Sequence, residues 1–426
     1  MRRKRFSSGA HPLFTGLLLM LGLTASAMAG QKKILYTFTG GQDGGYPTYP
    51  GLIFDDARNL YGTTNGGGIG PQGGFGTVFE LKPKADGSWK ERVLYRFAGH
   101  RDGAFPSSGL IFDKSGNLYG VTSFGGGRGW CPIVNVNYFC GTVFELKRGG
   151  NGQWTEIVLR RFDNGIGGGM PFHNLILDER GNLYGTAVGG KGCRQNDCGV
   201  VFRLTPTKKR EWNEKVLYTF HGSDGGGPGS PLLFDAKGNL YGVTAGGGPR
   251  KQGLVFKLEP TRNGPWKETI LHYFNPFENY DGSGPCGFLT FDSAGNLYGS
   301  TQHGGRYSCG GLGCGMVYKL DHDTWTESTV FALNGHNFKG LYNDEQGVAF
   351  DASGNLYGTA SGSTLYPGGI FELIPQADGS WREHTISRFP ANSAPGMAIY
   401  GNDGNLYGVT DEGGAYKKGT VFQITP

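Results

Sequence analysis

Short apolar runs separated by polar turns recur along the whole chain. The string Asn-Leu-Tyr-Gly occurs seven times, with its tyrosines at Tyr61, Tyr119, Tyr184, Tyr241, Tyr298, Tyr357 and Tyr407. Around it lies one template: an apolar triplet ending in Asp, a turn, LYG, a glycine-rich loop, the motif GTVFEL, a polar turn, a Trp and the motif VLYRF. Each of the four apolar runs in the template is four to six residues long. Because turn residues bound every run, the pattern predicts four antiparallel strands per repeat.

The turn between the first two predicted strands has a physical rationale. In the second repeat it runs from Asp113 to Asn117, where the Asp caps the turn and Gly116 supplies a positive φ. The Asp is present in six repeats and is replaced by Gly401 in the seventh. Arg58 replaces the Gly in the first repeat, which predicts strain or a variant turn there.

The two ends of the chain complement each other. The last repeat stops at 421–424, after its third strand, and residues 34–38 match the fourth strand at 93–97. Adding that leading strand to the last repeat gives 28 strands, or seven sets of four. A ring needs such a strand to cover the edge of its last blade. We therefore predict a closed seven-bladed β-propeller, with an open β-solenoid as the alternative.

Composition supports an all-β protein with one propeller domain over residues 30–426. Eighty glycines occur without a collagen period and beside many Phe and Tyr residues, which favours tight turns over disorder. In the predicted propeller the first strand of each repeat is innermost and the fourth is outermost. The Trp before the fourth strand is interpreted as an inter-blade packing residue; it occurs at Trp89, Trp154, Trp212, Trp266, Trp325 and Trp381.

The first 29 residues have the plan of a secretory signal peptide. Basic residues 2–5 precede an apolar core at 13–23, and a small-residue cleavage motif lies at 27–29. Of the 40 basic and 35 acidic residues, four basic ones lie in this segment, which leaves 36 against 35. The mature chain thus has no basic excess typical of a nucleic-acid-binding protein. We expect an exported monomer, extracellular or periplasmic, without an integral membrane span.

The repeat motif resembles a known family. Residues 106–122 with 141–146, and again 231–244, are similar to the GloVer (Gloeo/Verruco) tandem repeat of secreted bacterial proteins. The general pattern is also similar to other propeller repeats, including the NHL and streptogramin-lyase types. The resemblance covers essentially the whole mature chain. It implies a propeller-like fold and export, and supplies no assigned activity.

Seven cysteines are present, and six of them form local pairs in the loops between second and third strands. These pairs are Cys131 with Cys140, Cys193 with Cys198, and Cys309 with Cys314. In an exported chain they predict disulfides that stiffen long loops. Metal sites are the alternative, although no His accompanies the pairs at ligand spacing. Cys286 is left over, and we interpret it as a buried thiol rather than a nucleophile.

A second theme, Asp-Gly before a Pro, marks the loops that lead into the first strand. Asp43, Asp102, Asp224 and Asp281 occupy it. The simpler interpretation is a turn that returns the chain to the channel. The alternative is an array of carboxylates that binds Ca²⁺ or sugar hydroxyls. Aromatic residues in or near these loops could stack on sugars or cap the loop cores: Tyr46, Tyr49, Phe105, Trp130, Tyr280 and Tyr307.

Four histidines lie in loops of the same face: His100, His221, His303 and His336. A His-based elimination site is conceivable there, but no paired motif, nucleophile elbow or metal triplet accompanies them. Surface or turn positions are the favoured interpretation.

The sequence therefore leaves three hypotheses for function. The first is a binding propeller for a glycan or an envelope protein, acting through its disulfide-braced loops; no cofactor is evident, and Ca²⁺ is a candidate ion. The second is a carbohydrate-active or lyase-type enzyme that uses Asp and His residues at the channel mouth. The third is a structural repeat protein of the cell surface.

Overall fold

The computed structural model describes residues 30–47, 51–70, 73–128, 130–133, 136–190, 198–209, 211–262, 264–307, 309, 313–334, 347–360, 368–390, 393 and 395–426. The predicted signal peptide, residues 1–29, lies outside the described residues. All regular elements in the described residues are strands, which form seven antiparallel sheets. Within that part of the chain, no helix could cross a membrane.

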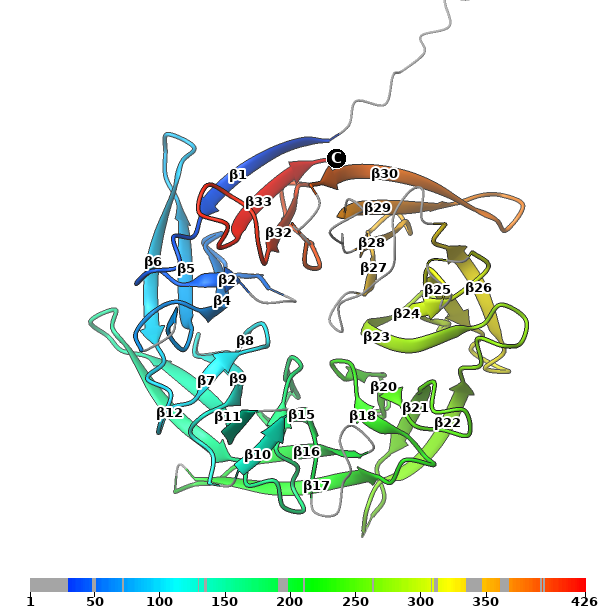
Figure 1. The fold of residues 1–426 in the computed structure, drawn as a ribbon, viewed down its shortest axis with the longest axis horizontal. Coiled ribbons are helices and arrows are strands. Elements are labelled where there is room, and N and C mark those ends of the chain that lie inside the picture. The colour runs from blue at the N-terminus through cyan, green and yellow to red at the C-terminus, as the bar shows by residue number, and fades with distance from the viewer. Residues whose placement is uncertain are drawn as a thin grey trace, which may run out of the picture.

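The sheets are arranged as blades around a central axis, so the predicted seven-bladed propeller is confirmed (Figure 1). Blade 1 contains β2 (Gly45–Pro47), β3 (Ile53–Phe54), β4 (Leu60–Gly66), β5 (Thr77–Pro83) and β6 (Trp89–Arg96). Blade 2 contains β7 (Ala104–Pro106), β8 (Ile111–Phe112), β9 (Leu118–Phe124), β10 (Trp130–Ile133), β11 (Val136–Arg148) and β12 (Trp154–Arg161). Blade 3 contains β13 (Met170–Pro171), β14 (Ile176–Leu177), β15 (Leu183–Val188), β16 (Gly199–Pro206) and β17 (Trp212–Phe220). Blade 4 contains β18 (Gly226–Pro228), β19 (Leu233–Phe234), β20 (Leu240–Gly246), β21 (Leu254–Glu259) and β22 (Lys267–Tyr273).

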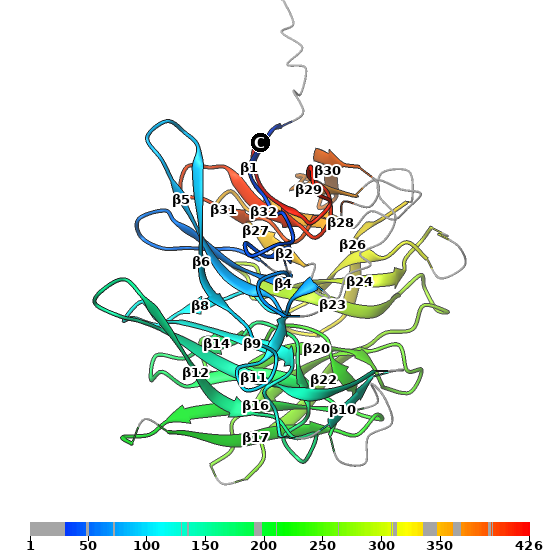
Figure 2. The same ribbon diagram turned by 60° about the vertical axis from the view of Figure 1, so that its left-hand side comes forward.

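The remaining blades follow the same plan (Figure 2). Blade 5 contains β23 (Gly282–Phe291), β24 (Leu297–Gly304), β25 (Met316–Leu320) and β26 (Glu327–Ala332). Blade 6 contains β27 (Val348–Phe350), β28 (Leu356–Ala360), β29 (Gly368–Pro375) and β30 (Trp381–Phe389). Blade 7 contains β31 (Ile399–Tyr400), β32 (Leu406–Thr410), β33 (Thr420–Thr425) and, as its outer strand, β1 (Gln31–Thr37).

The N-terminal strand completes blade 7, as predicted. β1 pairs antiparallel with β33, and their register shifts between Ile34 and Tyr36. Every other pairing of a third with a fourth strand contains a β-bulge at the corresponding place, as between β5 and β6. β1 therefore reproduces the fourth strand down to its irregularity, and the ring is closed by the first strand of the chain (Figure 1).

The innermost strand differs from the single run predicted. In blades 1 to 4 it consists of two short segments that both pair with the second strand, such as β7 and β8 with β9. A Pro ends the first segment in each of these blades, for example Pro106 at the end of β7. Because Pro has no N–H to donate, it interrupts the ladder and lets the chain turn along the channel before pairing resumes.

The motif Asp-x-x-Gly-Asn-Leu-Tyr forms one hydrogen-bonded unit. In blade 2, Asp113 Oδ1 accepts from the backbone N–H groups of Ser115 and Asn117 at 2.8 and 2.9 Å. Its Oδ2 accepts from Asn117 Nδ2 at 2.8 Å and from the Tyr119 hydroxyl at 3.1 Å. The predicted Asp cap is confirmed, and the unit explains why the motif's polar residues recur together.

Pairs of aromatic side chains make the core between blades. At five of the seven junctions the Phe at the end of a fourth strand packs on the Phe of the next blade's GTVFEL motif, as Phe97 does on Phe144 with ring centroids 5.2 Å apart. At the junction of blades 4 and 5, Phe274 packs on Tyr318 instead. Phe38, just after β1, makes the same contact with Phe79 at 5.1 Å. A Cβ on Gly62 would lie 2.6 Å from the Phe79 ring, so the Gly of Asn-Leu-Tyr-Gly leaves room for this Phe.

The repeat Trp residues confirm their predicted packing role. Trp212 of blade 3 packs on Tyr119 of blade 2, with ring centroids 6.1 Å apart. Four further junctions carry the equivalent pair: Trp89–Tyr407, Trp266–Tyr184, Trp325–Tyr241 and Trp381–Tyr298. Five of the seven junctions thus share one Trp–Tyr packing geometry.

Candidate functional site

Two sets of loops emerge at the same end of every blade. The 4–1 loops join a fourth strand to the next first strand, and the 2–3 loops join second to third strands. In blade 1 they meet through the backbone hydrogen bond from Gly68 to Gly41 (2.8 Å), and in blade 5 through that from Gly305 to Asp281 (3.2 Å). We call this end of the propeller the loop face. It carries most of the sequence that departs from the template.

Disulfides brace the loop face, as predicted. Cys131–Cys140 and Cys309–Cys314 are bonded, each with Cα atoms 5.0 Å apart. Cys198 is also disulfide-bonded, whereas Cys193 lies outside the described residues. Because both described pairs form disulfides, the structure favours the disulfide prediction over the metal-site alternative for them.

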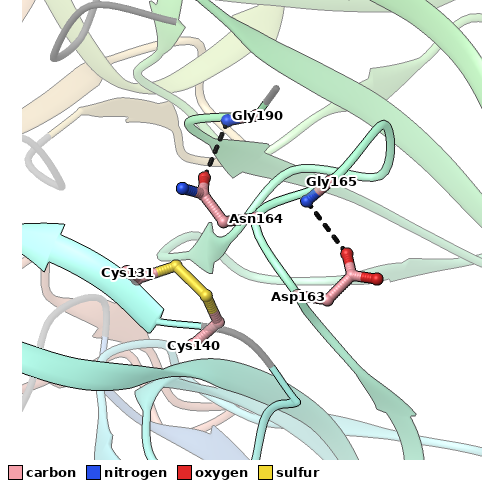
Figure 3. Close-up of a disulfide and its surroundings, with 6 residues drawn as sticks. All are labelled: Cys131, Cys140, Asp163, Asn164, Gly165 and Gly190. Atoms are coloured by element: carbon pink, nitrogen blue, oxygen red, sulfur yellow. Dashed lines mark hydrogen bonds between the residues drawn. A yellow bond between two sulfur atoms is a disulfide. The ribbon is translucent and has the colours of Figure 1, made fainter. Parts of the chain in front are cut away.

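The blade 2 disulfide stiffens a junction rather than a free loop tip (Figure 3). Cys131 and Cys140 are both buried, and a Cβ on Gly169 in blade 3's 4–1 loop would lie 2.4 Å from Cys131 Sγ. Beside it, the Asn164 side chain accepts from the Gly190 N–H at 2.9 Å and joins the 4–1 and 2–3 loops of blade 3. The disulfide therefore packs closely against the 4–1 loop of blade 3.

Cys286 lies in β23 opposite Ser300 and is 1% exposed. Its thiol is buried, in agreement with the interpretation made from the sequence. A buried thiol away from the loop surface is inert toward external substrates.

The four aspartates of the 4–1 loops lie beside the outer strands. Asp102 Oδ2 accepts from the Tyr95 hydroxyl at 2.9 Å and from the Ala98 N–H at 2.8 Å. Asp43 and Asp224 bind the hydroxyls of Tyr36 (3.1 Å) and Tyr218 (2.8 Å) in the same way. 

In the fourth strand of blade 4 a histidine replaces the tyrosine, and His272 Nε2 lies 3.1 Å from Oδ2 of Asp281 in the loop that enters blade 5. Each carboxylate is thus occupied in tying a fourth strand to the loop that follows it. This placement favours the turn interpretation; binding of Ca²⁺ by these residues stays a prediction.

A glutamate of the next blade faces each of these aspartates. Two residues after the repeat Trp, on the outer strand, lie Glu91, Glu156, Glu268 and Glu327, which we call the junction glutamates. In each, the Oε1 atom is buried and has no hydrogen-bond partner among the described residues. The Trp-x-Glu motif recurs in six repeats and is the signal by which these residues could have been found in the sequence.

Burial and the facing aspartate raise the pKa of the junction glutamates. The pKa of Glu91 is about 7 because of burial and the charge of Asp43, with Arg96 opposing both. Burial and the charge of Asp102 raise the pKa of Glu156 to about 8. Glu268 and Glu327 reach about 7 through burial, with Asp224 and Asp281 respectively adding to it. The pKa values of these four carboxyls therefore lie near neutral pH rather than near 4.5.

The hydrogen-bond geometry of blade 4 agrees with a protonated glutamate. The Tyr218 oxygen lies 2.8 Å from Asp224 Oδ2 and 2.8 Å from Glu268 Oε2. One phenol has only one proton to donate, so the second contact requires a proton on a carboxyl group. In the fourth strand of blade 2 an arginine stands in the tyrosine position, and Arg160 forms a 2.8 Å ion pair with Glu214 of blade 3.

The predicted histidines do not converge. His100 is exposed and packs on Phe75 at 6.5 Å, and the His221 backbone N–H donates to Asp224 at 2.6 Å. His303 is half-buried in β24, and burial lowers its pKa. His336 lies outside the described residues. In the part of the chain that the structure covers, no three His, Cys, Asp or Glu residues are grouped as metal ligands.

Large apolar side chains are exposed on the loop face. Those in its loops are Ile69, Ile166, Phe277, Tyr280, Tyr307 and Tyr416, and Tyr46 lies in the adjoining β2. Of the predicted aromatic residues, Tyr46 lies under the Lys418 ammonium, 4.5 Å from its ring, and Phe105 packs on Phe75 as a cap of the loop core. Tyr49 and the side chain of Trp130 lie outside the described part.

Blade 5 holds the most exposed group. Phe277 is 80% exposed, Tyr280 65% and Tyr307 43%. Tyr280 has a φ of 60°, a left-handed conformation that an aromatic residue rarely adopts. The Asp281–Gly305 hydrogen bond joins the loops of Tyr280 and Tyr307, and the Cys309–Cys314 disulfide braces the second of these loops.

Comparison with known sequences identifies the repeat. The sequence model described as the Gloeobacter/Verrucomicrobia repeat matches residues 22–233, 129–338 and 230–426. No curated protein matches the chain significantly.

Solved structures with a similar arrangement share little sequence with the chain. A putative gluconolactonase is 14% identical, with 93% of this chain and 92% of that chain covered and a TM-score of 0.41. A protein of unknown function from Dyadobacter fermentans DSM 18053 is 10% identical, with 92% and 98% covered and a TM-score of 0.46. A luciferin-regenerating enzyme is 12% identical, with 93% and 95% covered and a TM-score of 0.42. At this level of similarity no activity is transferred from these proteins.

Proposed function

The chain belongs to the Gloeobacter/Verrucomicrobia repeat family, and from that premise we propose that it is an exported glycan-binding propeller whose loop face is the binding surface. Disulfides persist in oxidising compartments, which agrees with the export predicted from residues 1–29. The proposal concerns binding, because the described aspartates and histidines serve turns and junctions rather than a common catalytic centre.

The exposed aromatic group of blade 5 carries the proposal. Apolar side chains exposed together on a folded protein mark an interaction surface. Phe277, Tyr280 and Tyr307 lie on loops that a hydrogen bond joins. Tyr280 has a strained backbone conformation, although its ring is exposed to solvent and gains little from packing. Strain of this kind is typical of functional positions.

The chemistry of the group suits a sugar chain. Aromatic rings offer flat apolar surfaces for the C–H faces of sugars, and tyrosine adds a hydroxyl that binds sugar oxygens. Exposed basic residues lie in the neighbouring 2–3 loops, namely Arg250 and Lys251 of blade 4 and Arg306 of blade 5. The Gly284 N–H donates to the Gln252 carbonyl at 2.9 Å, so the loops of blades 4 and 5 form one surface.

A glycan array probed with the mature chain, with and without Ca²⁺, tests the proposal. We expect binding to one glycan class, and a loss of at least about tenfold in affinity in the variant F277A/Y280A/Y307A. Removal of Ca²⁺ tests the predicted role of the loop aspartates in the same assay.

The matched control removes exposed apolar side chains away from the loop face. The variant I34A/I157A alters outer strands of blades 7 and 2 and should bind as the wild type does. Equal affinity of the blade 5 variant and the control would contradict the proposal. Absence of binding to every glycan, with capture of an envelope protein instead, would identify the loop face as a protein-binding surface.

A further inference from the structure

Two departures from the repeat template meet at the junction that closes the ring. Arg58 replaces the turn Gly of blade 1, and Gly401 replaces the turn Asp of blade 7. The two turns lie at the end of the blades opposite to the loop face, and together they line a cavity of about 190 Å³. We call this cavity the closure pocket.

The exchange of Asp for Gly401 keeps the pocket open. In the template the turn Asp binds the Tyr hydroxyl, but in blade 7 Asp403 accepts from the Tyr407 hydroxyl at 2.8 Å instead. A Cβ on Gly401 would lie 2.6 Å from Asp403 Oδ1 and 2.7 Å from Tyr407 Cε2. An Asp side chain at this position would therefore compete with Asp403 and Tyr407 for the space.

The exchange of Gly for Arg58 places a cation at the pocket under strain. Arg58 has a φ of 64°, which the glycines of the other six turns adopt readily. The rest of its turn is regular, since Asp55 Oδ1 accepts from Ala57 and Asn59 at 2.9 and 2.8 Å. The Arg58 side chain is exposed and forms no salt bridge with any described residue. A strained, unpaired arginine at a pocket points to a ligand.

Aromatic rings form the walls of the pocket. Phe54, Trp89 and Tyr407 line it, with Tyr407 packed edge-on against Phe54 at 5.0 Å and Trp89 at 6.3 Å. Similar rings meet at other junctions, so the walls of the pocket belong to the repeat.

Polar groups that can form further hydrogen bonds also line the pocket. Arg58, Asn402 and Asp403 line the pocket, and Asp403 uses only part of its acceptor capacity on Tyr407 and Asn405. Asp55, which also lines it, is already bound by four donors. The lining has one positive charge, on Arg58, and two negative charges, on Asp55 and Asp403, which disfavours an anionic ligand. Because four donors already engage Asp55, Arg58 and Asp403 are the charged groups left for a ligand, and their opposite signs favour a neutral one.

We propose that the closure pocket binds a single neutral pyranose, such as the terminal sugar of a glycan. Apolar ring faces and planar amide, guanidinium and carboxylate groups match the two faces and vicinal hydroxyls of a sugar ring. The volume is below that of pockets for drug-sized ligands and suits one sugar ring. This site is separate from the loop face and does not depend on the function proposed for it.

The template itself supplies the test variants. Arg58→Gly and Gly401→Asp each restore the residue that the other six turns carry, so both should fold. Arg58→Gly removes a charged hydrogen-bond donor, and Gly401→Asp fills the cavity. We expect methyl glycosides of neutral hexopyranoses to bind the wild type with millimolar affinity, measured by ligand-observed NMR, and both variants to bind at least tenfold more weakly.

Two further measurements make the result decisive. The F277A/Y280A/Y307A variant should keep its affinity for the methyl glycoside, which separates the closure pocket from the loop face. Failure of all neutral pyranosides to bind, or unchanged affinity in Arg58→Gly, would overturn the proposal. Stronger binding of a methyl glucuronoside or of tetramethylammonium than of the neutral glycosides would overturn the ligand class.

Discussion

Replacing the four junction glutamates with glutamine should remove most of the pH dependence of stability between pH 5 and pH 8. The variant E91Q/E156Q/E268Q/E327Q keeps the shape of each side chain and supplies the neutral form permanently. The contacts support this substitution, because one oxygen of each glutamate is buried without a partner among the described residues.

The sign follows from where the protons bind. The pKa values of these carboxyls rise from 4.5 to about 7, and to about 8 for Glu156, so the folded chain binds more protons than the unfolded chain between these values. Stability is therefore highest near pH 4.5 and falls as the pH rises through 7. A shift from 4.5 to 7 corresponds to about 3.4 kcal/mol, which solvent screening of these half-exposed groups reduces to about 1 kcal/mol each. Four separate junctions then give about 4 kcal/mol in the free energy of unfolding.

Urea unfolding at pH 5, 6, 7 and 8 measures this effect. The wild type should lose about 4 kcal/mol across the series, and the glutamine variant should lose less than about 1 kcal/mol. A charge-matched control replaces four exposed glutamates: Glu179, Glu211, Glu278 and Glu412. The reasoning is refuted if the control flattens the profile as much as the junction variant, or if the wild type is equally stable at pH 5 and pH 8.

Two further predictions concern closure and bracing. Phe38→Ala should lower the free energy of unfolding, measured with urea, by about 3–5 kcal/mol, as much as Phe97→Ala, because both rings are fully buried at equivalent junctions. The control is Ile34→Ala, whose side chain is 47% exposed. A loss in Phe38→Ala as small as in this control would contradict ring closure. The double variant C131A/C140A should lose about 2–3 kcal/mol, since the disulfide closes a short loop, and an unchanged unfolding midpoint would argue against bracing of blades 2 and 3.

The sequence predicts the architecture well because each element of the repeat has a local cause. The Asp, Gly and Asn of the turn are one hydrogen-bonded unit, so their recurrence marks every first hairpin. Residues 34–38 match the fourth strand at 93–97 but have no third strand before them in the chain. The last repeat has a third strand without a fourth, so the match predicts that residues 34–38 pair with β33. These inferences need only short-range chemistry and the requirement that a sheet edge be covered.

The candidate sites are harder to predict, since they depend on contacts between neighbouring repeats. The Trp-x-Glu motif is visible in the sequence. The proximity of Glu91 to Asp43, however, appears only when neighbouring blades are packed against each other. The sequence favours a turn role for the aspartates of the 4–1 loops and leaves ligand binding as the alternative. Their bonds to Tyr95, Tyr218 and His272 appear only when the outer strand is in place.

Closure also explains how a sevenfold repeat acquires one singular junction. Internal junctions join repeats that are consecutive in the chain, whereas the closing junction joins the first repeat to the last. Gly401 and Arg58 are therefore far apart in sequence, and each alone would be a tolerated irregularity of one turn. The pairing of β1 with β33 brings the two turns together. The side chain absent at Gly401 leaves a space, and Arg58 of the other turn lines that space. The strand that seals the ring thus also brings together the two exceptional turns that line the closure pocket.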